Sequence, residues 1–220
     1  MRSLLLLCAL LLAGFWLVPA TVGASDVAER AEMLEKSLQA VEWYTNESVR
    51  KALQAEQTGD NANATLFGNK AIESDLKAQG LRQQTADAWL AAGKPARAQA
   101  VWRRAADMAR ERGDMLANRI PVQWQLWQDG KGRDVAVDAE REKQYLLAVF
   151  FTAQHWDAVA QFSVAAGDAE QQRIALAALQ QLLPPLQRNN RLAAVLVGDS
   201  HEADYLGQLQ RWQQRAGQAR

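Results

Sequence analysis

One stretch near the C-terminal end combines side chains that could support catalysis. It consists of an apolar run over residues 193–197 followed by Gly198, Asp199, Ser200 and His201. A serine hydroxyl acts as a nucleophile when a neighbouring base takes its proton and a carboxylate orients that base. The chemistry would be ester hydrolysis or acyl transfer through Ser200. Only 19 residues follow His201, and none of them is a histidine.

This stretch resembles the first block of the SGNH hydrolase and acyltransferase family, in which an apolar strand leads into Gly-Asp-Ser. The resemblance implies that Ser200 is the nucleophile, with its base and carboxylate supplied by an Asp-x-x-His block far downstream. No such block follows, and the remaining residues leave no room for the parallel sheet. We therefore interpret Gly198 as a helix end, and Asp199 as the N-cap of a last helix with Glu202 in a capping box.

The rest of the chain offers little chemistry for a metal or cofactor. Cys8 is the only cysteine, so residues 25–220 cannot form a disulfide, a thiolate zinc site or a covalent haem attachment. The two histidines, His155 and His201, each stand without a second ligand at metal-binding spacing. We expect no catalytic residue, no metal and no cofactor, and therefore a protein that is not an enzyme.

The first 24 residues have the three parts of a secretory signal peptide. Arg2 is followed by an apolar run from Leu4 to Val18 and by a small-residue exit that ends at Ala24. The run is 15 residues long, whereas a membrane-spanning helix needs about 20. We predict cleavage of residues 1–24, with an uncleaved anchor as the alternative. The alanine-rich, cysteine-poor composition is typical of bacteria, so we expect an exported, periplasmic protein.

Charge and composition narrow the class of partner and fold. Residues 25–220 carry 24 basic and 25 acidic side chains, a net charge of −1, which does not favour nucleic acid binding. Basic side chains gather between Lys94 and Arg119, which we interpret as a solvated outer face; an acidic partner or anionic polymer is the alternative. Alanine, glutamine, arginine and leucine dominate, and these are helix formers. We predict an all-α fold.

An amphipathic helix is predicted over residues 25–44, and a repeat follows it. Gly59 and Gly93 are 34 residues apart, and alanines stand five and twelve positions after each of them. A glycine at an inter-helix turn, followed by small residues, is typical of antiparallel helix pairs that approach closely. Such pairs stack on one another to bury their apolar faces.

This repeat resembles the tetratricopeptide repeat (TPR) family. Residues 79–112 carry the resemblance at Trp89, Gly93, Ala98, Trp102 and Ala105. Residues 45–78 match at Ala52, Gly59, Ala64 and Ala71, but depart at Ser48 and Gly68, and neither unit has the closing proline. The resemblance implies antiparallel helix pairs stacked as a short right-handed solenoid, which would extend over residues 45–183.

Beyond residue 113 the register weakens, but further turns are predicted. They lie at Gly130–Gly132, at Gln154-His155 and at Gly167-Asp168, and Pro184-Pro185 should end the helix that begins at Ala169. Residues 184–220 are predicted to be capping helices, the last with an apolar stripe of Tyr205, Leu209 and Trp212. On α-helical spacing Trp124 and Trp127 should share one face.

The TPR resemblance implies that the chain binds a protein or peptide partner in the cell envelope, as a scaffold in secretion or polysaccharide export would. The residues proposed to contact it are Gln83, Asp87, Gln123 and Gln125. Two alternatives remain: a small serine esterase or acyltransferase that uses Ser200, and a periplasmic holdase chaperone. The chaperone would need a large exposed apolar patch.

We predict that the mature chain begins at Ser25, because Val22 and Ala24 are the small side chains that signal peptidase accepts. Intact-mass measurement of the protein from the envelope fraction should give the mass of residues 25–220. Cleavage after Ala20 would give a slightly larger mass. A full-length chain retained in the inner membrane would contradict export.

Overall fold

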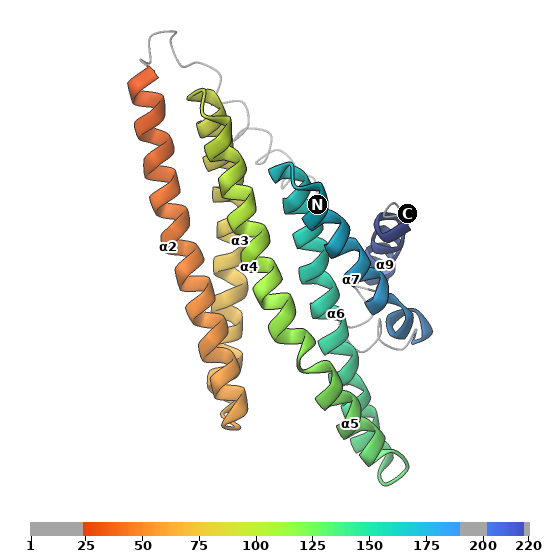
Figure 1. Ribbon diagram of the computed structural model, residues 1–220. Helices are drawn as coiled ribbons and strands as arrows, with labels where there is room; N and C mark the ends of the chain where they lie inside the picture. The colour runs from red at the N-terminus through yellow and green to blue at the C-terminus, as the bar shows by residue number, and fades with distance from the viewer. Residues whose placement is uncertain (1–23, 190–201, 218–220) are drawn as a thin grey trace, which may run out of the picture. The chain divides into compact units, whose positions relative to one another are not determined.

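The computed structural model describes residues 24–189 and 202–217, and every regular element in these ranges is an α-helix (Figure 1). The predicted all-α class is therefore confirmed. The predicted signal peptide lies outside the described residues, except for Ala24. Ser200, His201 and the apolar run before them also lie outside. The chain divides into two units, residues 1–98 and 99–220, which are described separately.

The first unit is a hairpin of two long helices, α2 (Ala24–Gln57) and α3 (Asn61–Ala91), which pack against each other along their length. The apolar stripe predicted for residues 25–44 faces this contact, where Ala31 and Leu38 are fully buried. Ala71 and Ala78 are buried on α3. The small side chains allow the two backbones to approach closely.

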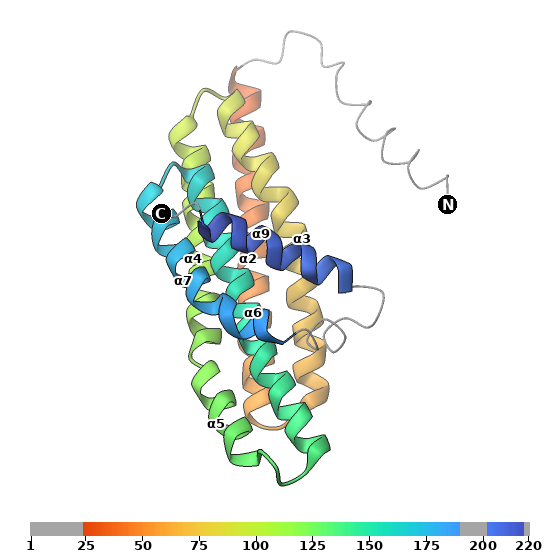
Figure 2. The same cartoon turned by 90° about the vertical axis from the view of Figure 1, so that its right-hand side faces the viewer.

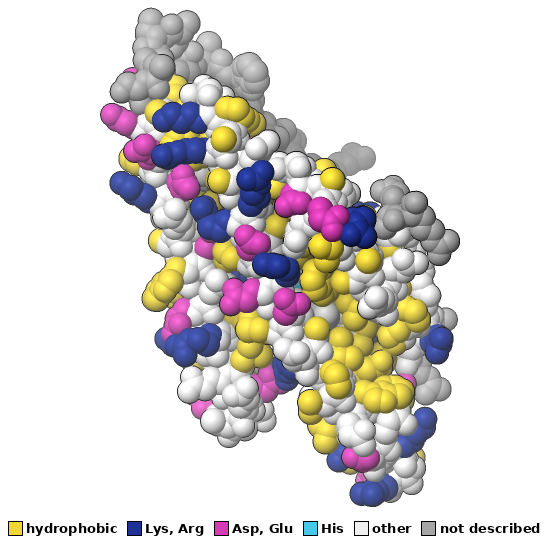
Figure 3. All heavy atoms as spheres, viewed as in Figure 1, with side chains coloured by type: hydrophobic (Ala, Val, Ile, Leu, Met, Phe, Trp, Pro, Cys, Tyr) yellow, Lys and Arg dark blue, Asp and Glu magenta, His cyan; other side chains and the backbone are white. Residues whose placement is uncertain are grey.

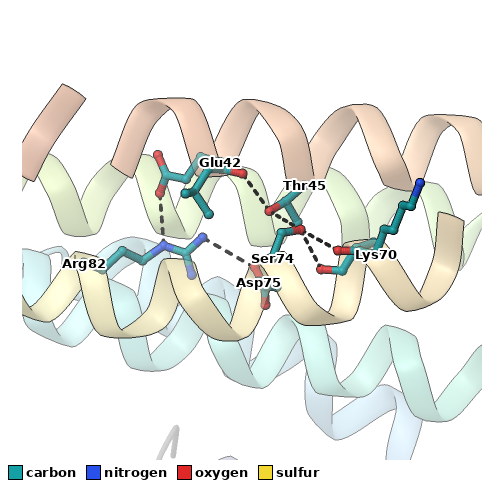
Figure 4. Close-up of polar contacts among 8 residues, drawn as sticks. Glu42, Thr45, Lys70, Ser74, Asp75 and Arg82 are labelled. Atoms are coloured by element: carbon teal, nitrogen blue, oxygen red, sulfur yellow. Dashed lines mark hydrogen bonds and ion pairs between the residues drawn. The ribbon is translucent and has the colours of Figure 1, made fainter. Parts of the chain in front are cut away.

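A row of polar side chains also lies inside this hairpin (Figure 4). Thr45 Oγ1 donates to Ser74 Oγ at 2.9 Å. The Arg82 guanidinium bonds Glu42 Oε1 through Nε at 3.0 Å and lies 3.6 Å from Asp75 Oδ1. The side chains of Arg82 and Glu42 are 3% and 4% exposed, so this pair is out of water. Buried polar groups of this kind are tolerated because each finds a partner.

Trp89 anchors the far end of the first unit and has no exposed surface. Its indole Nε1 donates to Glu35 Oε2 of α2 at 2.9 Å. Lys94 and Arg97, at the start of α4 (Pro95–Ala117), hold their cationic groups 5.1 and 4.4 Å from the ring centroid. The repeat position occupied by Trp89 is therefore a core position, and the tryptophan is satisfied in both its apolar and its polar parts.

In its described residues the second unit contains the rest of α4 and four further helices. They are α5 (Ile120–Gly130), α6 (Val135–Ala166), α7 (Ala169–Arg188) and α9 (Glu202–Gly217). The core joins α6, α7 and α9, and Figure 2 shows α9 lying across the other two. The predicted stripe of α9 is confirmed, since Tyr205, Leu209 and Trp212 are all buried in it.

The predicted turns are confirmed at four glycines with positive φ. Gly59, Gly93, Gly132 and Gly167 have φ between 70° and 79°, a region that side chains rarely adopt. Asp60 and Asp168 follow two of these glycines and accept a bond from a backbone N–H in the first turn of the next helix.

Four predicted helix breaks are wrong. The chain stays helical between the units 45–78 and 79–112, because α3 runs from Asn61 to Ala91 with no strong helix breaker at that boundary. The predicted turn at Gln154-His155 lies within α6, where neither residue opposes a helix. The helix α2 likewise continues past residue 45 without interruption.

The fourth wrong break is at Pro184-Pro185, which α7 passes before ending at Arg188. Each proline removes one backbone N–H, but residues 180 and 181 of the preceding turn are exposed, so water can bond the freed carbonyls. Leu183 and Leu186 are 5% and 1% exposed, and this burial holds the last turn helical.

We predict that Tyr205→Phe leaves stability unchanged or raises it by up to about 1 kcal/mol at neutral pH, since the buried Tyr205 hydroxyl has no hydrogen-bond partner in the described residues. Burial raises the pKa of Tyr205 to about 12. Between about pH 10 and this value the unfolded chain loses the phenolic proton while the folded chain keeps it, so wild-type stability should fall as pH rises.

Urea denaturation at neutral and alkaline pH measures both effects. The Tyr205→Phe variant should not show the fall in stability above about pH 10 that the Tyr205 phenol causes in the wild type. A cost above about 2 kcal/mol at neutral pH would show that the hydroxyl is bonded in solution.

Candidate functional site

Two of the four predicted partner-binding residues lie together in the first unit. Gln83 and Asp87 are exposed on one face of α3, and Gln83 Nε2 donates to Asp87 Oδ1 at 2.9 Å. Leu76 and Leu90, at helical spacing from them, are 63% and 54% exposed. The pair is thus a surface feature between exposed leucines, and its side chains satisfy each other.

The other two, Gln123 and Gln125, lie on α5 in the second unit. Gln125 is exposed and donates through Nε2 to Asp129 Oδ1 at 2.8 Å. Gln123 is half-buried. Residues two apart on a helix point in different directions, so these two glutamines do not form one site.

Beside these glutamines, α5 and α6 form a cluster of three aromatic rings. The centroids of Trp124 and Trp127 are 5.2 Å apart, edge to face, which confirms that the two share a side of the helix. Tyr145 of α6 lies 5.0 Å from Trp124 and stacks on Trp127 at 5.7 Å. Lys131 Nζ lies 5.3 Å from the centroid of Trp127. Each ring contacts the other two, at distances typical of favourable aromatic pairs.

Local sequence explains why the hairpin places these rings together. Pro121 suits the first turn of α5, where no N–H is required, and Gly132 has φ 79° in the connection. Asp134 then begins α6 by accepting bonds from the N–H groups of Ala136 and Val137 at 2.8 and 3.2 Å. The connection is short, so the aromatic side chains of the two helices face each other.

Arg141 of α6 ties the hairpin together from the other side. Its Nη1 donates to the backbone carbonyl of Leu126 at 3.0 Å, across the connection. Gly130 makes room for this guanidinium, because an added Cβ would overlap it and would lie 3.0 Å from Arg141 Cδ. The hairpin geometry therefore depends on a glycine at the end of α5.

The hairpin also exposes apolar side chains on more than one side, which we together name the α5–α6 surface: Val122 and Leu126, which are one helical turn apart on α5, Trp124, which points away from them, and Val135 and Val137 of α6. The exposed fractions run from 42% for Trp124 to 88% for Val135. In Figure 3 hydrophobic side chains gather over α5 and α6, toward the lower right. Exposed apolar residues are normal when scattered, but a concentration on one element marks an interaction site.

Neither the hairpin nor the rest of the described chain shows a metal centre or a membrane span. No three side chains of His, Cys, Asp or Glu come together as ligands in residues 24–189 and 202–217. Within the same ranges no helix has an apolar stretch of the length that crossing a bilayer requires.

Burial raises the pKa of Tyr145 above its usual range, since the ring is half-buried between the two helices. The position of Tyr145 beside the tryptophans could not be predicted from sequence, because Tyr145 and the two tryptophans belong to different helices.

Comparison with protein-family models, with curated proteins and with solved structures finds no match to this chain.

We predict that Gly130→Ala destabilises the chain by about 0.5–1 kcal/mol, because the new Cβ displaces Arg141 from the Leu126 carbonyl. In an Arg141→Ala background the same change should be neutral or slightly stabilising, as alanine favours a helix over glycine. Thermal and urea denaturation of the four chains give the coupling energy.

Gly68→Ala is the matched control for this cycle. A Cβ at Gly68 meets no atom within 4 Å, so this change should stabilise the protein by about 0.5–1 kcal/mol. Equal effects of Gly130→Ala with and without Arg141 would disprove the coupling.

Proposed function

We propose that this chain is a non-enzymatic, exported helical module that binds a protein partner in the cell envelope through the α5–α6 surface. The observation that supports this proposal best is the ring cluster of Trp124, Trp127 and Tyr145 beside exposed apolar side chains. Tryptophan and tyrosine are the residues most enriched among binding hot spots. Rings that already contact one another lose little conformational entropy when a partner binds.

The chemistry of the hairpin favours a protein over a saccharide. A sugar stacks on an open ring face, whereas Trp127 has Tyr145 stacked against it and Lys131 over its ring. The hairpin also carries aliphatic side chains, Val122 and Leu126, that fit an apolar protein segment.

The charges of the hairpin argue against a polyanion. Asp129 and Lys131 stand beside each other, so neither sign dominates. The part of the chain predicted to be mature has a net charge near zero, which agrees with shape and apolar contact as the basis of recognition.

The finer architecture belongs to this proposal as well. We expect antiparallel helix pairs to stack in the manner of a short right-handed TPR-like solenoid, with α2 and α3 as one such pair. Gln123 and Gln125 would then border the α5–α6 surface, and Gln83 and Asp87 would be separate candidate contacts on the first unit. Export through residues 1–24 would place the module in the periplasm, where a scaffold of a secretion or polysaccharide export assembly would work.

A second candidate function, a holdase chaperone, is favoured by the same exposed apolar side chains. A holdase would bind many unfolded chains through these side chains without a preferred sequence. A specific module would bind one partner at a fixed ratio. Suppression of aggregation of an unrelated unfolded protein therefore separates the two functions.

We predict that Trp124→Ala and Leu126→Ser each weaken partner binding about tenfold or more, because each removes a large exposed apolar side chain of α5. The partner is first captured from envelope extract by the mature chain, then purified and titrated against each variant. Trp43→Ala is the matched control: Trp43 is 68% exposed on α2 in the other unit and should bind as wild type.

Loss of binding must occur without loss of fold, which the melting temperature of each variant checks. Equal affinity of Trp124→Ala and wild type would rule out the hairpin as the binding surface.

Replacement of Ser200 and His201 together by alanine should leave function intact. If Ser200→Ala alone abolished function in a folded chain, the esterase or acyltransferase alternative would replace this proposal.

A further inference from the structure

The second unit holds a groove between α6, α7 and α9, apart from the α5–α6 surface. Its volume is about 610 Å³, within the range of sites that hold a ligand of drug size. The apolar part of its lining consists of Ala160 and Val164 of α6 and Leu176 of α7. These three side chains can receive one apolar group. Ala160 and Leu176 also belong to a core cluster with Ala109 of α4, which holds these two lining residues in place.

Two arginines of α9, Arg211 and Arg215, line the groove four residues apart and thus on one side of the helix. Arg215 is bonded through Nη1 to Asp157, a carboxylate only 4% exposed on α6. Asp157 also accepts from Gln161 Nε2 at 2.8 Å. The charge of Arg215 is therefore balanced, and the arginine is held in place at the groove wall.

Arg211 differs, because it has no acidic partner in the described part of the chain. Its one side-chain bond there is from Nη2 to Gln208 Oε1 at 2.5 Å, and Gln208 is neutral. The side chain is exposed and lines the groove. The groove lining contains no carboxylate, so an anionic group of a ligand would meet the Arg211 guanidinium without a competing acid in the lining.

The remaining lining residues are amides: Gln161, Gln172 and Gln214. An amide side chain offers both donors and acceptors, which matches the alternating N–H and C=O groups of an extended peptide. The lining contains no aromatic ring on which a sugar could stack. A single free arginine is also less than a phosphate site requires, since such sites gather several donors.

From these observations we infer that the α6–α7–α9 groove binds an extended peptide segment of a partner protein. The segment carries an apolar side chain, seated on Leu176 and Val164, and a carboxylate next to it, paired with Arg211. The carboxylate belongs either to an acidic side chain or to the C-terminus of the peptide. This site is separate from the α5–α6 surface and does not depend on it.

Fluorescence anisotropy with the mature chain, residues 25–220, tests the inference. The probe is a labelled peptide of the sequence Gly-Leu-Gly-Asp in three forms: with a free C-terminus, with an amidated C-terminus, and with an amidated C-terminus and Asn in place of Asp. Equal affinity of the first two forms, with weaker binding of the third, identifies an acidic side chain as the anion. Tighter binding of the first form than of the other two identifies the C-terminal carboxylate. Loss of both carboxylates should weaken binding about three- to tenfold.

Arg211→Gln should lower the affinity for the carboxylate-bearing peptide by the same factor. The variant should then bind this peptide and the amidated Asn form with equal affinity. Val164→Asp should weaken all three peptides, because it places a charge on the apolar part of the lining and repels the carboxylate. Arg173→Gln is the matched control, since Arg173 is an exposed arginine of α7 outside the groove, paired with Glu170 at 2.7 Å. This control should bind as wild type.

Three results would overturn the inference: no saturable binding of any form, unchanged affinity in Arg211→Gln, or displacement by inorganic phosphate at the same concentration as peptide. The last would show a general anion site. The Trp124→Ala variant should bind the peptide as wild type does. Loss of peptide binding in Arg211→Gln and loss of partner binding in Trp124→Ala therefore test the groove and the α5–α6 surface independently.

Discussion

The long helices of this protein depend on how the chain turns between them. At Gly59, Gly93 and Gly167 the same motif occurs: the glycine N–H bonds the carbonyl three residues earlier, and the next N–H bonds the carbonyl five residues earlier. This arrangement requires left-handed backbone at the glycine, with φ between 70° and 74° at the three sites. A side chain there would oppose that conformation. The positions of these glycines therefore decide where each helix ends and how long it is.

Within that frame the two units stabilise their helix contacts differently. The first unit packs alanines and a buried polar row, with Arg82 and Glu42 at its centre. The second unit buries larger side chains, including Leu179, Leu183 and Trp212, around α6, α7 and α9. Large residues fill the space where helices of different lengths meet, from 16 residues in α9 to 32 in α6, whereas small residues suit the close contact of α2 with α3. The α5–α6 surface and the peptide groove both lie on the second unit, which has the larger core residues.

Local patterns predicted the turns well, because a glycine before a capping residue acts within a few residues of itself. They also predicted the buried stripe of α9 and the pairing of Trp124 with Trp127. The wrong helix breaks had another origin. The alanine spacing of a TPR also occurs in long alanine-rich helices, so it does not show whether the chain turns between two repeat units. No proline lies near Ala78, and α3 continues through this boundary. Pro184 is a local breaker that burial of its leucine neighbours overrides.

Tyr145 and the lining of the groove could not be predicted, because their positions depend on contacts between helices far apart in sequence. The partner-binding roles of Gln83, Asp87, Gln123 and Gln125 remain predictions. Geometry shows why these residues were hard to rank from sequence: Gln83 and Gln125 each bond an acid one helical turn away, as glutamines on many solvated helices do.

The polar row between α2 and α3 has a mechanical consequence. If one helix slid along the other by a single turn, about 5.4 Å, Arg82 would leave Glu42 and Thr45 would leave Ser74. Separating a buried ion pair costs about 3–5 kcal/mol, far more than sliding an alanine surface over another one. The hairpin therefore resists axial shear, although its small side chains alone would allow it. The hairpin should therefore behave as a stiff rod about 50 Å long, the length of a 34-residue helix, when a force acts along its axis.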